Sequence, residues 1–339
     1  MGAAQTPIAV SMGEPAGIGP DLALLAWSNR KSLGLPPFYV RGDQHLLSQR
    51  AAKLGLKLLV DATSPEDASG QFSKVLPVVQ TGPSLEDRPG EEHPETAQSV
   101  VSSIETCVED VARGVAGGLM TNPINKAALY RTGFTFPGHT EFLGSLAGTH
   151  WPQEKSKPVM MIAGPELMVV PATIHIPLKD VPTALTEDLI VETAEITAAD
   201  LKNRFGYSNP RLAFCGLNPH AGENGTMGTE DRDVIAPAIK RLTEMGITAT
   251  GPHPADTLFH PPARTQYDCV IGMYHDQVLV PAKTIGFDDS VNVTLGLPFV
   301  RTSPDHGTAY SLAGTGEARI DSFAAALRMA YALANPDQY

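Results

Sequence analysis

The sequence predicts an α/β fold with a mostly parallel sheet, divided between two domains. Short apolar runs alternate with longer segments whose apolar residues recur at helical spacing, and this alternation favours parallel strands joined by helices. The chain has 339 residues, which is long for one compact core and favours two domains. A hydrophobic fraction of 42% with 18% charged residues indicates a folded, globular protein.

The alternation is clear in the first part of the chain. Strands are expected at residues 7–12, 37–42 and 115–123, with helices at 20–30, 45–56 and 96–114. Pro20 suits the first turn of its helix, and Gly114 suits a helix end. The acidic, proline-rich residues 81–95 are expected to form an exposed loop.

Beyond residue 155 the pattern becomes richer in strands. Residues 158–178 resemble a hairpin with Gly-Pro-Glu at its turn. Further strands are expected at 211–217 and 268–277, and helices at 186–206, 231–246 and 319–333.

Composition excludes several classes of function. The formal net charge of -12 argues against a nucleic-acid partner, which would require basic stripes. No apolar run approaches the ~20 residues that span a bilayer, and the first residues lack the features of a secretory signal. Three cysteines form no CxxC pair, and Cys215 and Cys269 lie in apolar runs, as expected for buried thiols in a reducing cytoplasm. We therefore expect a cytoplasmic protein with neither nucleic acid nor membrane as a partner.

Three histidines, His175, His220 and His275, stand beside the ends of apolar runs. Pro219 cannot continue a central strand, so the chain turns before His220, at the kind of strand end where open α/β sheets place ligands. Three imidazoles with an open fourth position suit a catalytic Zn²⁺ or Co²⁺ ion. The alternative is three unrelated surface or core histidines, because no short spacing such as HxxxH links them.

Two other stretches carry candidate ligand groups. The glycines of "SMGEPAGIGPD" (11–21) allow backbone amides to approach a ligand at a helix amino terminus, although a tight turn would use the same residues and GxGxxG is absent. In residues 291–310, Arg301 could pair bidentately with a phosphate or carboxylate. Lys283 is a second candidate cation, with an ordinary surface lysine as the alternative.

These stretches together resemble the 4-hydroxythreonine-4-phosphate dehydrogenase family of vitamin B6 biosynthesis. The matching blocks, in order, are "GEPAGIGPD", "TNPINK", "PGHTEF", "CGLNPHAGE", "MGTE", "PADTLF", "MYHDQ" and "NVTLGLPFVRTSPDHGTA". They run from Gly13 to Ala309, so the resemblance covers nearly the whole chain. "SMGEP" and "TNPINK" depart from the Thr-Pro-Gly-Glu-Pro and Gly-Pro-x-x-Lys forms expected in some relatives, and neither departure includes a proposed ligand.

The resemblance implies a two-domain, three-layer α/β/α fold similar to isocitrate and isopropylmalate dehydrogenases, with the active site in the interdomain cleft. The first domain is expected to be discontinuous, residues 1–130 plus 305–339. The second, 131–304, is expected to carry the metal ligands and the dimer contact. A homodimer whose subunits share each active site follows from the same resemblance.

It also implies roles for individual residues. The divalent-metal ligands, for Zn, Mg or Co, would be His175, His220 and His275. Substrate contacts would be His139, Thr140, Lys283, Asn292 and Arg301. NAD or NADP would bind at Asp305, His306 and Gly307, in a segment similar to the adenosine-binding loop of isopropylmalate dehydrogenases, with backbone amides of Gly17 and Gly19 nearby. Asp256 and Asp276 are candidate general bases, and either could instead orient a metal-bound histidine.

The implied reaction is NAD-dependent oxidation of 4-phosphooxy-L-threonine. Its 2-amino-3-oxo acid product decarboxylates to 3-amino-2-oxopropyl phosphate, in pyridoxal phosphate biosynthesis. A paralogue would act on another phosphorylated hydroxy acid, such as 4-phosphoerythronate, or on a dihydrodiol carboxylate. A three-histidine zinc hydrolase and a metal-binding regulatory protein are the alternatives outside the family.

Overall fold

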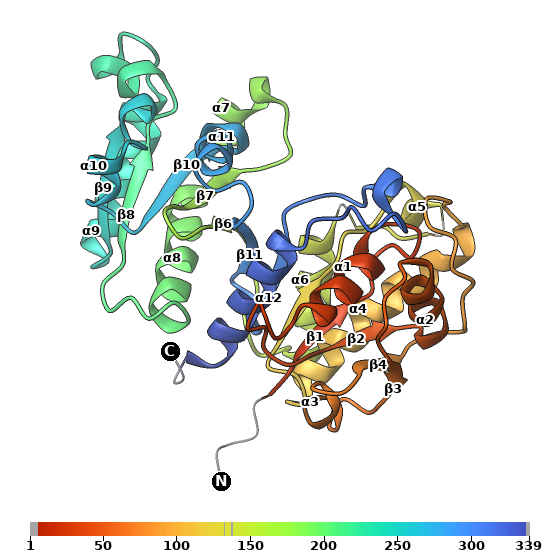
Figure 1. Ribbon diagram of the computed structural model, residues 1–339. Helices are drawn as coiled ribbons and strands as arrows, with labels where there is room; N and C mark the ends of the chain where they lie inside the picture. Colours follow the sequence, from red (N-terminus) through yellow and green to blue (C-terminus); the bar gives the residue numbers. More distant parts are fainter. Residues whose placement is uncertain (1–5, 132, 137, 337–339) are drawn as a thin grey trace. The chain divides into compact units, whose positions relative to one another are not determined.

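The structure is a computed structural model that describes residues 6–131, 133–136 and 138–336 (Figure 1). Pro137, the first residue of the "PGHTEF" block, lies outside the described residues. The chain forms two compact units: Met1–Pro158 with Leu297–Tyr339, and Val159–Gly296. The first unit is therefore built from both ends of the chain, while the domain limits expected above stay a prediction.

The strands of the first unit are ordered β3-β4-β2-β1-β5-β12, and every register described between these neighbours is parallel. Their bounds are β1 (Ile8–Ser11), β2 (Phe38–Gly42), β3 (Val60–Ala62), β4 (Leu76–Gln80), β5 (Gly118–Thr121) and β12 (Arg301–Pro304). The central strand β1 pairs with β2 on one side and with β5 on the other.

Helices cover both faces of this sheet. They are α1 (Gly19–Ser28), α2 (Gln44–Lys53), α3 (Ala68–Gln71), α4 (Ala97–Ala112), α5 (Lys126–Tyr130), α6 (His139–His150) and α12 (Asp321–Ala334). Phe38 of β2 packs edge-on against Phe323 of α12, with ring centroids 6.0 Å apart. The next residue, Tyr39, belongs to a buried cluster with Ile104 of α4. Because successive strand residues point to opposite faces, α12 and α4 lie on opposite sides of the sheet, which gives three layers.

The strands of the second unit are ordered β11-β6-β7-β10-β8-β9. Their bounds are β6 (Val159–Ala163), β7 (Met168–Thr173), β8 (Arg211–Cys215), β9 (Thr248–His253), β10 (Cys269–Tyr274) and β11 (Val291–Leu295). Strands β7, β10, β8 and β9 are parallel to one another, whereas β6 is antiparallel to both β7 and β11. The β6–β7 pair confirms the hairpin expected at 158–178.

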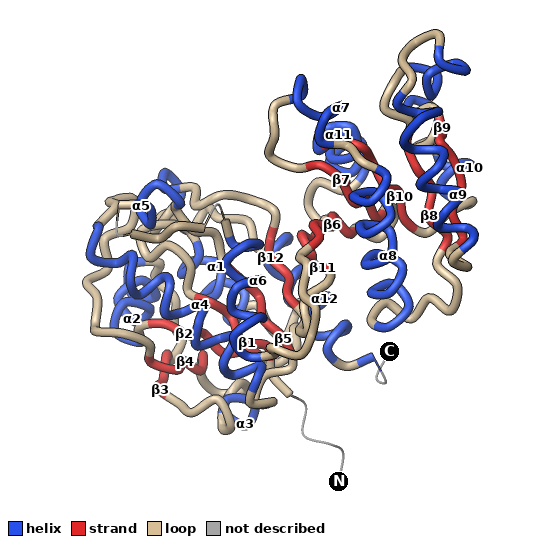
Figure 2. The backbone as a smooth tube through the Cα atoms, turned by 180° about the vertical axis from the view of Figure 1, so that it is seen from behind, coloured by secondary structure: helices blue, strands red, loops and turns tan. Residues whose placement is uncertain are grey.

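The helices of this unit are α7 (Val181–Ala184), α8 (Glu187–Asn203), α9 (Ala236–Glu244), α10 (Pro261–Arg264) and α11 (His275–Ile285). The long helices α8 and α9 pack against each other (Figure 2). Helix α8 also packs against β7, α9 against β9, and α11 against β7 and β10. The side-chain oxygen of Thr186 caps α8 by accepting from the amide of Leu189 at 3.1 Å.

The α/β class and the mostly parallel sheet are confirmed, and one boundary is corrected. The strand expected at 268–277 ends at Tyr274, and α11 begins at His275, so Asp276 is helical. Val278 and Ala282, four residues apart, are buried in the core of this unit and form the helix's apolar stripe. A short apolar run followed by polar residues does not reveal where a strand gives way to a helix.

A buried arginine ties together the loop that follows β1. Arg50 of α2 is 0% exposed, and its guanidinium donates to the carboxylate of Asp87 at 2.9 Å and to that of Asp21. It also donates to the carbonyls of Gly17 at 3.1 Å and Pro15 at 2.9 Å. One side chain therefore holds the glycine-rich loop, the start of α1 and the segment at 87 in a single network.

Replacing Arg50 by Met should strongly destabilise the first unit, because the buried carboxylate of Asp21 loses its cation and that of Asp87 keeps only Lys53, 3.5 Å away, at a cost of ~3–5 kcal/mol. Both tryptophans of the chain, Trp27 and Trp151, lie in this unit, so urea unfolding followed by tryptophan fluorescence reports on it alone. The control is Arg113→Met, which removes a guanidinium that is 57% exposed and should cost under ~1 kcal/mol. An equal loss of unfolding free energy in the two variants would show that the Arg50 network stabilises the first unit no more than an exposed ion pair does.

Candidate functional site

The three histidines at strand ends lie in the second unit, after neighbouring parallel strands. His175 follows β7 by two residues, His275 follows β10 directly, and His220 lies in the turn after β8. Since β7, β10 and β8 are adjacent and parallel, their carboxyl ends meet at one edge of the sheet. His220 follows a strand as expected, whereas His175 and His275 were expected within the ranges 158–178 and 268–277 and instead follow β7 and β10. Open α/β sheets bind ligands at such an edge.

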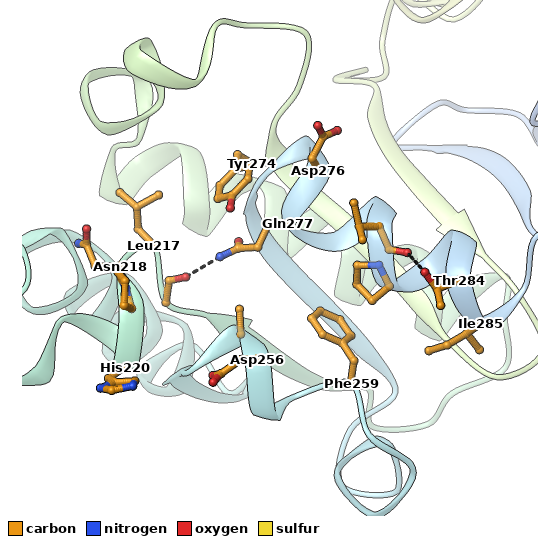
Figure 3. A pocket seen from close by; sticks show the side chains of 15 residues that line it. Leu217, Asn218, His220, Asp256, Phe259, Tyr274, Asp276, Gln277, Thr284 and Ile285 are labelled. Atoms are coloured by element: carbon orange, nitrogen blue, oxygen red, sulfur yellow. Dashed lines mark hydrogen bonds between the residues drawn. The ribbon is translucent and has the colours of Figure 1, made fainter.

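Two cavities open at this edge. The larger, about 890 Å³, is lined by His220, Asp256, Tyr274 and Asp276 together with apolar residues of α11 (Figure 3). The smaller, about 340 Å³, is lined by His175 and His275 and shares Tyr274 and Asp276 with the first. Both candidate general bases therefore lie on the same cavity as His220, and Asp276 also borders the cavity of the other two histidines.

His175 and His275 are spaced as ligands of one metal ion would be. Their ring centroids are 5.7 Å apart, and two imidazoles bound tetrahedrally at Zn–N distances of ~2.1 Å have centroids roughly 5 Å apart. Nδ1 of His275 lies 2.7 Å from Oδ1 of Asp276. When Nδ1 carries the ring proton in this contact, Nε2 is left with its lone pair available to a metal.

The donor set fits a divalent ion in its chemistry, and the His175–His275 pair fits in spacing. His220 lies on the adjoining cavity. Among residues 6–131, 133–136 and 138–336, no three His, Cys, Asp or Glu side chains already stand in a coordinating arrangement. The three histidines are therefore a candidate ligand set in which His175 and His275 share one cavity and His220 lines the other.

The other expected substrate contacts of this unit lie elsewhere. Lys283 is in the last turn of α11, with Nζ 5.3 Å from the ring centroid of Phe287, and Asn292 is in β11 opposite Ile162 of β6. Neither residue lines either of the two cavities. The structure places the candidate ligands and bases of this unit on two adjoining cavities, and these two contacts on neither.

The first unit holds a positively charged group of candidate residues. Arg301, 3% exposed, donates through Nε and Nη2 to the hydroxyl of Thr121, at 3.2 and 2.6 Å, and burial lowers its pKa to about 10. The pKa of His139 lies well below its ordinary value because of burial first and then the positive charges of Arg301 and Lys126. Nε2 of His139 is buried with no hydrogen-bond partner among the described residues. A neutral, unsatisfied imidazole beside two cations is a place where an anion would be stabilised.

Lys126 was not expected as a site residue. It begins α5, and its Nζ lies 3.3 Å from the place where a Cβ on Gly138 would stand. Gly138 immediately precedes α6, whose first two residues are His139 and Thr140. The lysine of the "TNPINK" block was the available signal, but only the fold brings it to the start of α6.

The two segments expected to bind the cofactor contact each other in the first unit. The amide of Ile18 donates to the carbonyl of Thr308 at 3.0 Å, so the loop holding Gly17 and Gly19 lies against the segment after Asp305, His306 and Gly307. A Cβ on Gly17 would stand 2.8 Å from the carbonyl of Thr308, and one on Gly19 would stand 2.5 Å from that of Met12. Packing therefore already requires glycine at both positions.

The chain is similar to known proteins over most of its length. The profile described as "Pyridoxal phosphate biosynthetic protein PdxA" matches residues 35–330. The chain is 54% identical to a 4-hydroxythreonine-4-phosphate dehydrogenase of Xanthobacter autotrophicus, over 98% of this chain and 95% of that protein. It is 50% identical to one of Bradyrhizobium diazoefficiens, over 98% of each chain.

The fold is also shared with a solved structure. The crystal structure of 4-hydroxythreonine-4-phosphate dehydrogenase from Klebsiella pneumoniae superposes with a TM-score of 0.85 at 34% identity, over 98% of this chain and 99% of that chain. The similarity thus extends over nearly the full length in both sequence and fold.

Replacing Lys126 by Met should raise the pKa of His139 towards its ordinary value, because one of the two cations that disfavour the imidazolium is removed. The measurement is an NMR titration of the histidine ring nitrogens, with His139 assigned from a His139→Gln variant. Lys74→Met, which removes another exposed lysine of the same unit, is the control and should leave that pKa unchanged. A His139 pKa that ignores the Lys126 change would show that the two residues are not electrostatically coupled.

Proposed function

Because the chain belongs to the PdxA family of pyridoxal phosphate biosynthetic proteins, we propose that it oxidises 4-phosphooxy-L-threonine with NAD or NADP. The observation that carries this proposal is the 54% identity, over nearly the whole chain, to a relative named 4-hydroxythreonine-4-phosphate dehydrogenase. The alcohol becomes a ketone as hydride passes to the nicotinamide, and the resulting 2-amino-3-oxo acid loses CO₂ to give 3-amino-2-oxopropyl phosphate.

His175, His220 and His275 are the proposed ligands of one divalent ion, Zn, Mg or Co. Such an ion, when bound, polarises the substrate hydroxyl and stabilises negative charge on oxygen during oxidation and decarboxylation. Asp276 orients His275 through the 2.7 Å contact described above. Asp256 is exposed on the large cavity, so we assign it the role of general base that accepts the hydroxyl proton.

The substrate phosphate is the proposed partner of the cationic group in the first unit. Arg301 offers a planar fork, and His139 and Thr140 stand at the start of α6, where backbone amides favour anions. Lys126 adds a further positive charge. This concentration of charge favours a phosphate dianion over the single carboxylate of a dihydrodiol acid. Lys283 and Asn292 are proposed as additional substrate contacts on the family resemblance.

The cofactor is proposed to bind along Asp305, His306 and Gly307, with Gly17 and Gly19 in the adjoining loop. The hydrogen bond between Ile18 and Thr308 supports this proposal, because it makes the two segments neighbours.

A homodimer with shared active sites is proposed from the surface of the second unit. Ile176 and Leu178 line the smaller cavity and Val280 lines the larger, and all three side chains are exposed. Apolar residues at a cavity mouth mark an interaction surface, and a symmetric dimer would bury them on both subunits. We also propose a cytoplasmic location, which suits three buried, unpaired cysteines. No helix in the described part of the chain is long and apolar enough to cross a membrane.

The function is tested by following NADH formation from 4-phosphooxy-L-threonine, with 4-phosphoerythronate and a cis-dihydrodiol carboxylate as comparators. We expect turnover of 4-phosphooxy-L-threonine, loss of activity after EDTA treatment, and recovery when Zn²⁺, Co²⁺ or Mg²⁺ is added back. A hydrolase would form no NADH. Turnover of the dihydrodiol carboxylate alone would refute the substrate assignment. Full activity after EDTA treatment would refute the metal assignment.

Replacing Leu178 by Asp should dissociate the dimer, because each subunit would bring an unpaired carboxylate into an apolar contact. Leu59→Asp is the matched control: Leu178 is 66% exposed and Leu59 is 68% exposed, but Leu59 lies in the other unit. Sedimentation velocity should show a monomer only for Leu178→Asp. A dimer that survives this change would place the interface elsewhere.

A further inference from the structure

The turn that carries His220 is built around one buried carboxylate. Asp231, 2% exposed, accepts hydrogen bonds from the amide of Leu217 at 2.7 Å, from the amide of Asn218 at 3.2 Å and from the Asn218 side chain at 2.9 Å. Three donors therefore converge on its two oxygens. The Asn218 side-chain amide also donates to Glu230 at 2.8 Å, which ties the start of the turn to the residue before Asp231.

The backbone wraps closely around this carboxylate. A Cβ on Gly216 would stand 2.6 Å from one oxygen of Asp231, and a Cβ on Gly222 would stand 3.0 Å from the other. Gly222 also has a φ of 74°, which glycine adopts without strain. Both glycines allow the chain to pass the carboxylate without a side chain between them.

Four non-glycine residues of the turn have left-handed backbone angles. His220 has a φ of 52°, and Ala221, Glu223 and Asn224 have φ values of 51°, 40° and 58°. Such a conformation costs on the order of 1 kcal/mol or more per residue and persists only where surrounding contacts impose it. In this turn three hydrogen bonds converge on the buried carboxylate of Asp231, 11 residues beyond His220 in sequence.

We propose that Asp231 is the positioning residue for His220: its carboxylate holds the turn after β8 so that the imidazole stays at the large cavity. The inference rests on the proposed function, since it takes His220 as a metal ligand. Asp231 does not touch the metal or the substrate in this account. It acts by restricting the turn to one backbone conformation, so that metal binding by His220 does not also carry the entropic cost of ordering the turn.

Asp231→Asn is the informative substitution, because it keeps the shape but replaces one acceptor oxygen by an NH₂ group. That group would face amide donors, so at least one converging hydrogen bond is lost. The matched control is Asp233→Asn, because Asp233 is exposed and its carboxylate pairs with the neighbouring Arg232. Deuterium uptake of the metal-free protein in residues 217–222 should rise in Asp231→Asn and stay unchanged in Asp233→Asn.

The functional readout is Co²⁺ affinity by titration calorimetry. We expect Asp231→Asn to weaken it ~10–100-fold, as loss of a group that orients a ligand does. The double variant with His220→Ala distinguishes positioning from a general structural role. If Asp231 acts through His220, the double variant binds Co²⁺ no more weakly than His220→Ala alone; a purely structural role would weaken it further.

The outcomes separate this inference from the proposed function. Co²⁺ affinity lowered by His220→Ala but untouched by Asp231→Asn would overturn the positioning role alone. Affinity untouched by His220→Ala would overturn the metal assignment and the inference together. If Asp231→Asn does not fold, Asn218→Ala removes the side-chain hydrogen bonds to Asp231 and Glu230 and keeps both backbone bonds to Asp231. It should weaken Co²⁺ binding in the same direction by a smaller factor; wild-type affinity in that variant would overturn the inference.

Discussion

The parallel pairing of β7, β10 and β8 is the constraint on which the candidate site depends. In this register Val270 of β10 stands opposite Val169 of β7 and Ala213 of β8, so the three strands end at the same edge. A single side chain then fixes two of the segments that follow. Gln277 of α11 accepts from the amide of Met273 at 2.7 Å. It also donates to the carbonyl of Gly216 at 2.7 Å (Figure 3). The start of α11, which carries His275, is thereby tied to the turn that carries His220.

The first unit contains two buried groups whose pKa is lowered, Arg301 and His139. β12 pairs with β5, and this places Arg301 near Thr121, deep enough that burial lowers the arginine's pKa. His139 is kept neutral by the same burial and by neighbouring cations. Groups whose pKa is perturbed in this way cluster at functional sites. The Arg50 network is the opposite case, since its cation is matched by two carboxylates and serves the fold.

Much of this arrangement could be predicted from the sequence, because apolar runs and turn residues encode strand ends locally. The three histidines beside strands were found in this way, and so was the β6–β7 hairpin. The boundary at His275 was misjudged because α11 follows β10 with no turn residue between them. Lys126 and Asp231 were missed for a different reason: the hydrogen bonds of Asp231 and the charge contacts of Lys126 join residues 12 or more positions apart. The "TNPINK" block contains Lys126 but does not indicate what that lysine meets. Tertiary contacts of that kind are visible only in the fold.

The most direct test of the central claim, that neighbouring strand ends supply one metal site, is a crystal structure of the Co²⁺-loaded protein with anomalous data at the cobalt edge. The account predicts one strong peak per subunit, with ring nitrogens of His175, His220 and His275 at ~2.0–2.2 Å from it. A peak bound by other residues, or one that His220 does not reach, would contradict it.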